Sequence, residues 1–259
     1  MSPPGRPKGE YRSAKREGTP EIPPGRPKGE YRSAKREGTP SIATLDLDAG
    51  LVQLSALGGA TAALPRGARD KLAAYIELLA KWNRTYNLTA IREPERMVTH
   101  HVLDALAVLP HLCLAGAPPE LRLLDVGSGG GVPALPLAIA RPSWHIVALD
   151  SSHKKGAFLQ QAVIELALPN VEAVIARVED YAPPAPFDVV ISRAFSDLAT
   201  FAQSSARHLA PRGRLVAMKG VFPDEEIAQL PPAFRVVASP ALAVPGLDAE
   251  RHLIVMERA

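Results

Sequence analysis

The sequence has little cysteine and no long apolar run. Its 259 residues include one cysteine, Cys113, which excludes an intramolecular disulfide framework and a zinc site built from paired cysteines. We therefore predict a reducing compartment and no metal site. No stretch reaches the about 18 apolar residues that cross a bilayer, and the N-terminus lacks the apolar segment of a secretory signal. These absences predict a cytoplasmic protein with no membrane partner.

Acidic residues are in the minority only in the first forty residues, which hold ten Lys and Arg against five Glu. The whole chain has a formal net charge of +3, so the remainder is slightly acidic. The unit PPGRPKGEYRSAKREGTP starts at Pro3 and again at Pro23, with almost no aliphatic residue to bury. We expect residues 1–44 to form a disordered basic tail. Two interpretations stay open, namely an arm that contacts RNA phosphates or an extension without a role.

Two patterns follow the tail. Residues 69–86 carry apolar side chains at helical spacing, a second helix is predicted from Pro94 to about Leu112, and together they predict an N-terminal helical cap over residues 45–118. Short apolar strands then alternate with helices. The predicted strands cover residues 121–126, 144–149, 171–175, 187–191, 214–218, 234–239 and 252–257. This pattern is typical of an α/β fold with a Rossmann-like, mostly parallel seven-stranded sheet, here residues 119–259, which binds ligands at the carboxyl ends of its strands.

The strongest local signal is LLDVGSGGGVPALPL, which starts at Leu123. A strand ends near Asp125 and passes into a glycine-rich turn, where glycine permits positive φ and the close approach of a ligand. A dinucleotide fold would place a third glycine where Val132 stands, and Pro133 follows it here. The shorter spacing after an acidic strand end looks like the S-adenosylmethionine loop of class I methyltransferases.

Asp150 follows the second predicted strand. A carboxylate at this place accepts hydrogen bonds from both hydroxyls of a ribose. The alternative is a helix cap, because Asp150, Ser151 and Ser152 all precede the helix predicted from His153. We favour the ribose for Asp150 and the cap for one of the serines.

The loops after strands three and four supply further candidates. Val178 and Glu179 lie in the loop that meets adenine in such folds, with an ordinary polar loop as the alternative. Ser192-Arg193-Ala194-Phe195 stands where methyltransferases of exocyclic amines carry Asn/Asp-Pro-Pro-aromatic. We predict that Arg193 contacts cofactor or substrate, with a surface ion pair as the alternative. Cys113 precedes the first strand and is predicted to be a core residue rather than a nucleophile.

Basic and imidazole side chains lie near the same edge. Lys219 follows the fifth strand and either contacts a phosphate or base, or is simply solvated. His101, with His100 beside it and Asp104 one turn beyond, either faces the pocket or has a structural role. The candidates for a basic patch around the pocket are Lys154, Lys155, Arg193, Arg207 and Lys219.

Several stretches in order resemble one family. They are WNRTYNLTAIREPERMVTHHVLDAL, LLDVGSGGGVPALPLAIARP, LDSSHKKGAFL, RVEDY, PFDVVISRAF, MKG and GLDAERHLIVM, from about Trp82 to Glu257. The chain is similar there to the bacterial 16S rRNA 7-methylguanosine methyltransferases, the small-subunit methyltransferase G or glucose-inhibited division protein B family. The resemblance implies S-adenosylmethionine as cofactor and 16S rRNA or the small ribosomal subunit as partner. We expect a monomer.

The resemblance also implies roles within the site. Loop residues would line the methionine and adenosyl side, Asp150 and Ser151 would meet the ribose, and the next loop would bracket the adenine. The predicted cofactor-binding residues are Gly127, Ser128, Gly129, Gly131, Val132, Asp150, Ser151, Val178, Glu179 and Arg193. Family members often have Pro where Gly130 stands and Gly where Ala134 stands, so we expect a more flexible loop and weaker cofactor affinity.

No catalytic base is predicted. Guanine N7 carries an in-plane lone pair and no proton, so proximity and alignment with the methyl group are sufficient. Arg193 and Lys219 are the candidates for positioning the substrate. Two alternatives stay open, namely a class I methyltransferase acting on a protein or small molecule, and a non-catalytic ribosome- or RNA-binding module. Basic groups at the pocket mouth favour RNA, and failure to bind the cofactor favours the module.

Overall fold

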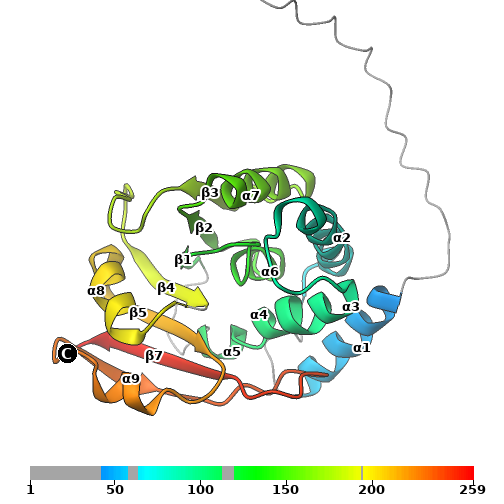
Figure 1. The fold of residues 1–259 in the computed structure, drawn as a ribbon. Coiled ribbons are helices and arrows are strands. Elements are labelled where there is room, and N and C mark those ends of the chain that lie inside the picture. The colour runs from blue at the N-terminus through cyan, green and yellow to red at the C-terminus, as the bar shows by residue number, and fades with distance from the viewer. Residues whose placement is uncertain (1–41, 58–63, 113–119, 194) are drawn as a thin grey trace, which may run out of the picture. The chain divides into compact units, whose positions relative to one another are not determined.

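The computed structural model describes residues 42–57, 64–112, 120–193 and 195–259. These ranges contain one seven-stranded sheet of order β3-β2-β1-β4-β5-β7-β6 (Figure 1). The strands are β1 (Arg122–Val126), β2 (His145–Asp150), β3 (Val171–Ile175), β4 (Phe187–Arg193), β5 (Leu209–Lys219), β6 (Phe234–Ala238) and β7 (His252–Arg258). The pairs from β3 to β5 are parallel and β7 runs antiparallel to both neighbours, so the predicted fold is confirmed.

Two predictions fall largely outside these ranges. The basic tail precedes them, except that α1 (Ile42–Ala56) begins at its last residues, and Cys113 lies outside as well. Within the described part of the chain, no helix is long and apolar enough to cross a membrane.

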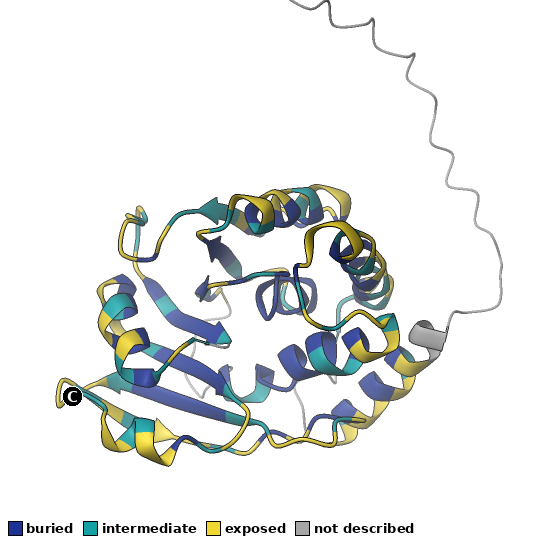
Figure 2. Cartoon of the chain, in the orientation of Figure 1, coloured by how far each residue is buried: buried dark blue, intermediate teal, exposed yellow. Residues whose placement is uncertain are grey.

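The two faces of the sheet bury two separate cores. Side chains alternate along each strand, so Leu123 and Ile146 face one side while Leu124 and Val147 face the other. The first side is covered by α6 (Ala134–Ala140), α7 (His153–Glu165) and the N-terminal helices. The second side is covered by α8 (Leu198–Ser205) and α9 (Asp224–Ala228). Strands β1, β2, β4 and β7 are largely buried between these helices, whereas the edge strands β3 and β6 are not (Figure 2).

The N-terminal helices share their core with the sheet. The predicted helix over residues 69–86 is confirmed as α2 (Ala68–Tyr86), and its Leu72 and Leu79 belong to the same cluster as Leu123 of β1. The cap therefore has no apolar core of its own among the described residues.

The second predicted cap helix is not continuous. It consists of α3 (Pro94–Met97), the π-helix η2 (Val98–Leu103), α4 (Asp104–Leu106) and α5 (Leu109–Leu112). The break before α5 has a covalent cause, because Pro110 has no backbone N–H to continue the helix. A π segment inserts one residue into the helical turn, and such segments often lie at functional sites.

Strand β5 begins five residues earlier than predicted. The helix before it ends at Ser205, and the 3-10 turn η3 (Ala206–His208) leads directly into Leu209, which pairs with Phe187. A Cβ at Gly213 would lie 2.7 Å from the Phe187 carbonyl oxygen, so glycine is required where these strands approach. The short α9 was not predicted, because five residues are too few to show helical periodicity.

Candidate functional site

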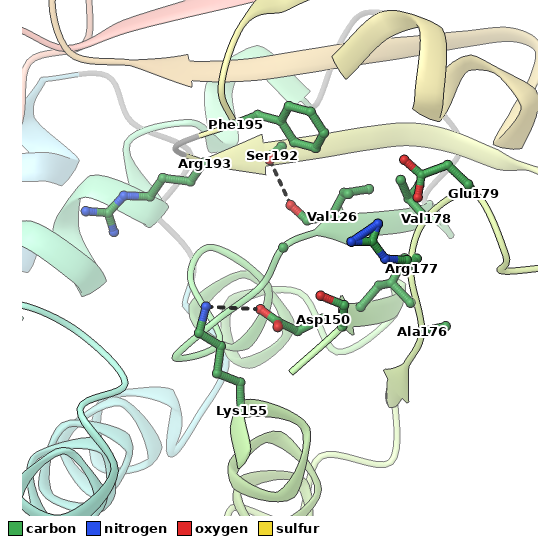
Figure 3. A pocket seen from close by; sticks show the side chains of 13 residues that line it. Val126, Asp150, Lys155, Ala176, Arg177, Val178, Glu179, Ser192, Arg193 and Phe195 are labelled. Carbon is green, nitrogen blue, oxygen red and sulfur yellow. Dashed lines mark hydrogen bonds and ion pairs between the residues drawn. The ribbon is translucent and has the colours of Figure 1, made fainter. Parts of the chain in front are cut away.

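A cavity of about 360 Å³ opens at the carboxyl ends of the parallel strands (Figure 3). Its walls come from the ends of β1, β2 and β4, from the start of α7, and from the loop after β3. The lining residues are Val126, Gly127, Leu149, Asp150, Ser151, Lys155, Ala176, Arg177, Val178, Glu179, Ser192, Arg193 and Phe195. Six predicted cofactor residues therefore meet at one cavity. The other four, Ser128, Gly129, Gly131 and Val132, do not line it and lie in the loop beside it.

Asp150 holds the glycine loop against the end of β2. One carboxylate oxygen accepts a hydrogen bond from the Gly129 N–H at 2.9 Å, and the other accepts one from the Ser152 N–H at 2.9 Å. Lys155 Nζ lies 3.6 Å from the first oxygen. Ser152 stands at the N-cap of α7, where a serine was predicted, but it makes no side-chain cap bond. The Asp150 carboxylate accepts the hydrogen bond from the Ser152 N–H, and its remaining lone pairs can accept hydrogen bonds from ligand hydroxyls.

The glycine loop depends on glycine at three positions. Gly127, Gly129 and Gly131 have φ of 76°, 58° and 84°. A Cβ on Gly131 would also lie 2.4 Å from Leu135 Cδ1. These three glycines therefore determine the path of the loop, because other residues rarely adopt their positive φ.

Asp125 lies fully buried beneath this loop. One of its oxygens accepts from the Ser128 hydroxyl at 2.7 Å and from the Ala134 N–H at 3.2 Å, so Ser128 secures the loop rather than lining the cavity. The other oxygen has no hydrogen-bond partner among the described residues. Burial raises the pKa of Asp125 to about 7, although these two hydrogen bonds oppose the rise.

This raised pKa predicts how stability depends on pH. The ordinary pKa of an aspartate is 3.8, so between that value and about 7 the folded chain binds a proton that the unfolded chain has released. The free energy of unfolding then falls as pH rises, by up to about 1.4 kcal/mol per pH unit. Asp125→Asn, which cannot ionise, is expected to gain stability relative to the unsubstituted chain between about pH 5 and pH 7.

Urea unfolding at several pH values measures this difference. The titration of His101, whose pKa burial and the nearby Arg193 lower to about 4, is common to both chains and cancels in the comparison. A stability difference that stays constant with pH would contradict the assignment.

Tyr75 connects α2 to the glycine loop. Its buried hydroxyl donates a hydrogen bond to the Gly130 carbonyl oxygen at 2.7 Å. The sequence showed Tyr75 only as an apolar position and Gly130 as a source of flexibility. The structure instead shows a contact that restrains the loop at Gly130.

Tyr75→Phe is expected to lower the free energy of unfolding by about 1–3 kcal/mol, because the Gly130 carbonyl would stay buried without its donor. Denaturant titration checks this value. Tyr86→Phe, an exposed position on the same helix, is the matched control and is expected to have almost no effect. Equal effects of the two substitutions would show that the hydroxyl contact does not stabilise the loop.

The loop after β3 is held from the α8 side of the sheet. His208 Nε2 lies 2.9 Å from the Val178 carbonyl oxygen, and Arg207 Nη1 donates to the Glu179 carbonyl oxygen at 2.7 Å. Because a carbonyl only accepts, His208 carries its proton on Nε2 when it makes this bond. Arg207, a predicted member of the basic patch, therefore supports the wall of the cavity.

Arg193 leads from this cavity to a second one. Its guanidinium points away from Val178 and Glu179 in Figure 3. Nη1 lies 3.2 Å from His101 Nδ1, and Nε lies 3.5 Å from Asp104 Oδ2. His101 Nδ1 also lies 3.0 Å from the His100 carbonyl oxygen, and its Nε2 lies 3.0 Å from the Thr89 hydroxyl. Because arginine only donates and a carbonyl only accepts, one tautomer of His101 can satisfy only one of the two neighbours of Nδ1. The surface ion pair given as the alternative for Arg193 is wrong in its location, because the partner carboxylate, that of Asp104, is buried.

The second cavity has a volume of about 290 Å³. It is lined by Asp104, Arg193, Met218, Lys219, Gly220 and Arg251. Lys219 is not simply solvated, because its Nζ contacts both carboxylate oxygens of Glu226, at 3.0 and 2.8 Å. Three of the five patch candidates therefore line one of the two cavities. Arg207 supports a wall, and Lys154 lines neither cavity.

Residues missed from the sequence are of two kinds. Arg177, Ser192 and Phe195 line the cavity close to predicted residues, but the sequence analysis gave them no role of their own. Arg251 lies far along the chain from its partner Asp104, and no local pattern signals that pair.

The comparisons with known proteins agree on one family. A family model described as rRNA small subunit methyltransferase G matches residues 68–254. The protein named ribosomal RNA small subunit methyltransferase G from Laribacter hongkongensis is 53% identical over 209 residues, which cover 81% of this chain and 95% of that protein. A protein of the same name from Chromobacterium violaceum is 50% identical over 216 residues, with coverages of 83% and 98%.

Solved structures share the fold at low identity. The glycopeptide N-methyltransferase MtfA complexed with sinefungin has a TM-score of 0.52 and 14% identity, covering 61% of this chain and 87% of that one. A SAM-dependent methyltransferase from Aquifex aeolicus has a TM-score of 0.50 and 18% identity, with coverages of 69% and 97%. These two likenesses concern the fold alone.

Proposed function

The chain belongs to the rRNA small subunit methyltransferase G family, and from that premise we propose that it transfers a methyl group to N7 of a guanine in 16S ribosomal RNA. S-adenosylmethionine is the methyl donor of this activity. The observation that carries the proposal is Asp150 at the end of β2, beside the glycine loop and facing the first cavity. This is the place where Rossmann-like folds bind a ribose.

The residues of the first cavity fit the cofactor. Asp150 and Ser151 would hold the ribose hydroxyls, Val178 and Glu179 would bracket the adenine, and Gly127 leaves room for close approach because it has no side chain. The cavity volume of about 360 Å³ falls within the usual range of small-molecule sites, about 300–1,000 Å³. Ser128, Gly129, Gly131 and Val132 would act indirectly, by fixing the loop.

Methyl transfer to guanine N7 mainly requires the protein to align N7 with the methyl group. S-adenosylmethionine supplies an electrophilic methyl group on a sulfonium ion. The N7 lone pair of guanine forms the new bond as the carbon–sulfur bond breaks, and no proton moves. The chain therefore has to hold the base in line and exclude water, and the two carboxylates at the cavity, Asp150 and Glu179, are assigned to the cofactor rather than to proton transfer.

The surroundings of the site favour RNA over the alternatives. Lys155 and Arg193 lie at the first cavity, and Arg193, Lys219 and Arg251 surround the second. Such groups suit a nucleotide phosphate, which a protein or small-molecule acceptor would not need. A non-catalytic module would have no use for the retained cofactor residues. We also propose that the protein acts in the cytoplasm as a monomer, on 16S rRNA within or apart from the small subunit.

The test is methyl transfer from radiolabelled S-adenosylmethionine to small-subunit RNA and particles from a strain that lacks the enzyme. Mapping of the labelled base follows. Label at N7 of a guanine supports the proposal. Label at another atom would keep the cofactor and reject the target, and cofactor binding without any labelled RNA would favour a protein or small-molecule acceptor.

A further inference from the structure

The second cavity is built around one buried carboxylate. Asp104 is 1% exposed, and its Oδ1 accepts a hydrogen bond from Arg251 Nε at 3.2 Å. Its Oδ2 lies 3.5 Å from Arg193 Nε, yet it has no hydrogen-bond partner among the described residues. Burial raises the pKa of Asp104 above its ordinary value, although the charges of Arg193 and Arg251 and the hydrogen bond from Arg251 oppose the rise.

An unpaired oxygen at this place needs an explanation. Two arginines account for the charge of a buried aspartate, but they leave Oδ2 without a donor, which is costly in a buried carboxylate. Asp104 comes from α4, directly after the π segment, and it lines the cavity that adjoins the first one through Arg193. A ligand in the second cavity that presents hydrogen-bond donors would supply the partner that Asp104 Oδ2 lacks.

We propose that the second cavity takes the acceptor guanine, and that Asp104 accepts hydrogen bonds from the N1–H and the 2-amino group of its Watson–Crick edge. This inference rests on the proposed function. Guanine offers two adjacent donors on that edge, and an ionised carboxylate offers two acceptor oxygens. Adenine presents a lone pair at N1, which the carboxylate would repel, and hypoxanthine lacks the 2-amino group. Asp104 is thus the residue that selects guanine.

The proposed orientation also suits the reaction. N7 lies on the Hoogsteen edge of the purine, apart from the N1 and 2-amino groups, so recognition by Asp104 leaves N7 free. Methylation at N7 places a positive charge on the ring, and a carboxylate bonded to N1–H stabilises that charge as it develops. Arg193 and Arg251 flank Asp104 and hold its carboxylate in place.

Nucleotide binding tests the inference without relying on turnover. GMP, IMP and AMP are titrated onto the full chain, with and without S-adenosylhomocysteine, and binding is followed by saturation-transfer NMR. GMP is expected to bind at least about tenfold more tightly than IMP or AMP, the effect of one hydrogen bond to a charged group. Asp104→Asn is expected to abolish this preference.

The matched control is Asp48→Asn. Asp48 also pairs with an arginine, Arg69, through two contacts of 2.7 Å, but it lies on α1 and lines neither cavity. This variant is expected to keep the preference for GMP. Circular dichroism checks that both variants fold. If Asp104→Asn does not fold, the nucleotide series on the unsubstituted chain still tests whether the cavity prefers GMP.

Equal binding of the three nucleotides, no binding of GMP, or a preference for GMP that survives Asp104→Asn would overturn the inference. Its failure is distinct from failure of the proposed function. If guanine in RNA is labelled but GMP is not preferred, only the proposed role of Asp104 is rejected. If GMP is preferred in a way that depends on Asp104 but no guanine in RNA is labelled, only the proposed reaction is rejected.

Discussion

Asp150→Ala is expected to weaken the binding of S-adenosylhomocysteine by at least about 100-fold, since several hydrogen bonds of about 1–3 kcal/mol each are lost. The carboxylate would no longer accept from ligand hydroxyls, and the N–H groups of Gly129 and Ser152 would lose their acceptor. The loop and the start of α7 would then have to be ordered by the ligand itself. Isothermal titration calorimetry measures the affinity, and methyl transfer is expected to be lost in parallel.

Asp188→Ala is the matched control for this prediction. Asp188 also accepts a hydrogen bond from a backbone N–H at a strand, that of Arg122 at 2.9 Å, but it lines neither cavity. It is expected to reduce stability without changing the affinity. If Asp150→Ala bound S-adenosylhomocysteine as tightly as the unsubstituted chain, the ribose assignment would be wrong.

Arg193→Met is expected to act on the reaction rather than on cofactor affinity. The guanidinium borders both cavities and points toward His101 and Asp104, away from the loop assigned to the adenine (Figure 3). Loss of a preorganised charged donor typically lowers the rate by about 100- to 1,000-fold. We expect that loss in single-turnover methyl transfer, with the dissociation constant of S-adenosylhomocysteine changed by less than about threefold.

The control for Arg193 is Arg235→Met. Arg235 pairs with Glu257 between β6 and β7, where its side chain is exposed and lines neither cavity. Both variants lose one positive charge and one ion pair, so a general charge effect on RNA binding would lower both activities equally. A loss confined to cofactor affinity would instead place Arg193 with the cofactor and leave the substrate unassigned.

The parts of the site that the sequence predicted share one property. Asp150, Val178 and Arg193 all lie at or just after a strand, and the carboxyl ends of parallel strands meet at one edge whatever the details of packing. Their positions therefore follow from identifying the strands. The positive φ of the glycine loop follows equally from local composition.

The missed features depend on tertiary packing. Tyr75 meets Gly130, and Arg251 meets Asp104, across 55 and 147 residues of sequence. An apolar pattern identifies Tyr75 as buried but does not say which group its hydroxyl meets. The π segment was missed for a related reason, because a search for helical periodicity assumes a regular turn.

The shared core of cap and sheet also limits how related enzymes can be recombined. Tyr75 holds the glycine loop, and His101 and Asp104 hold Arg193 at the end of β4. The cap thus supplies one partner in each of these polar contacts. A chimera that joins the cap of one family member to the sheet of another would break pairs that must change together. The cap and the sheet of this chain therefore have to change together if the contacts at the two cavities are to be kept.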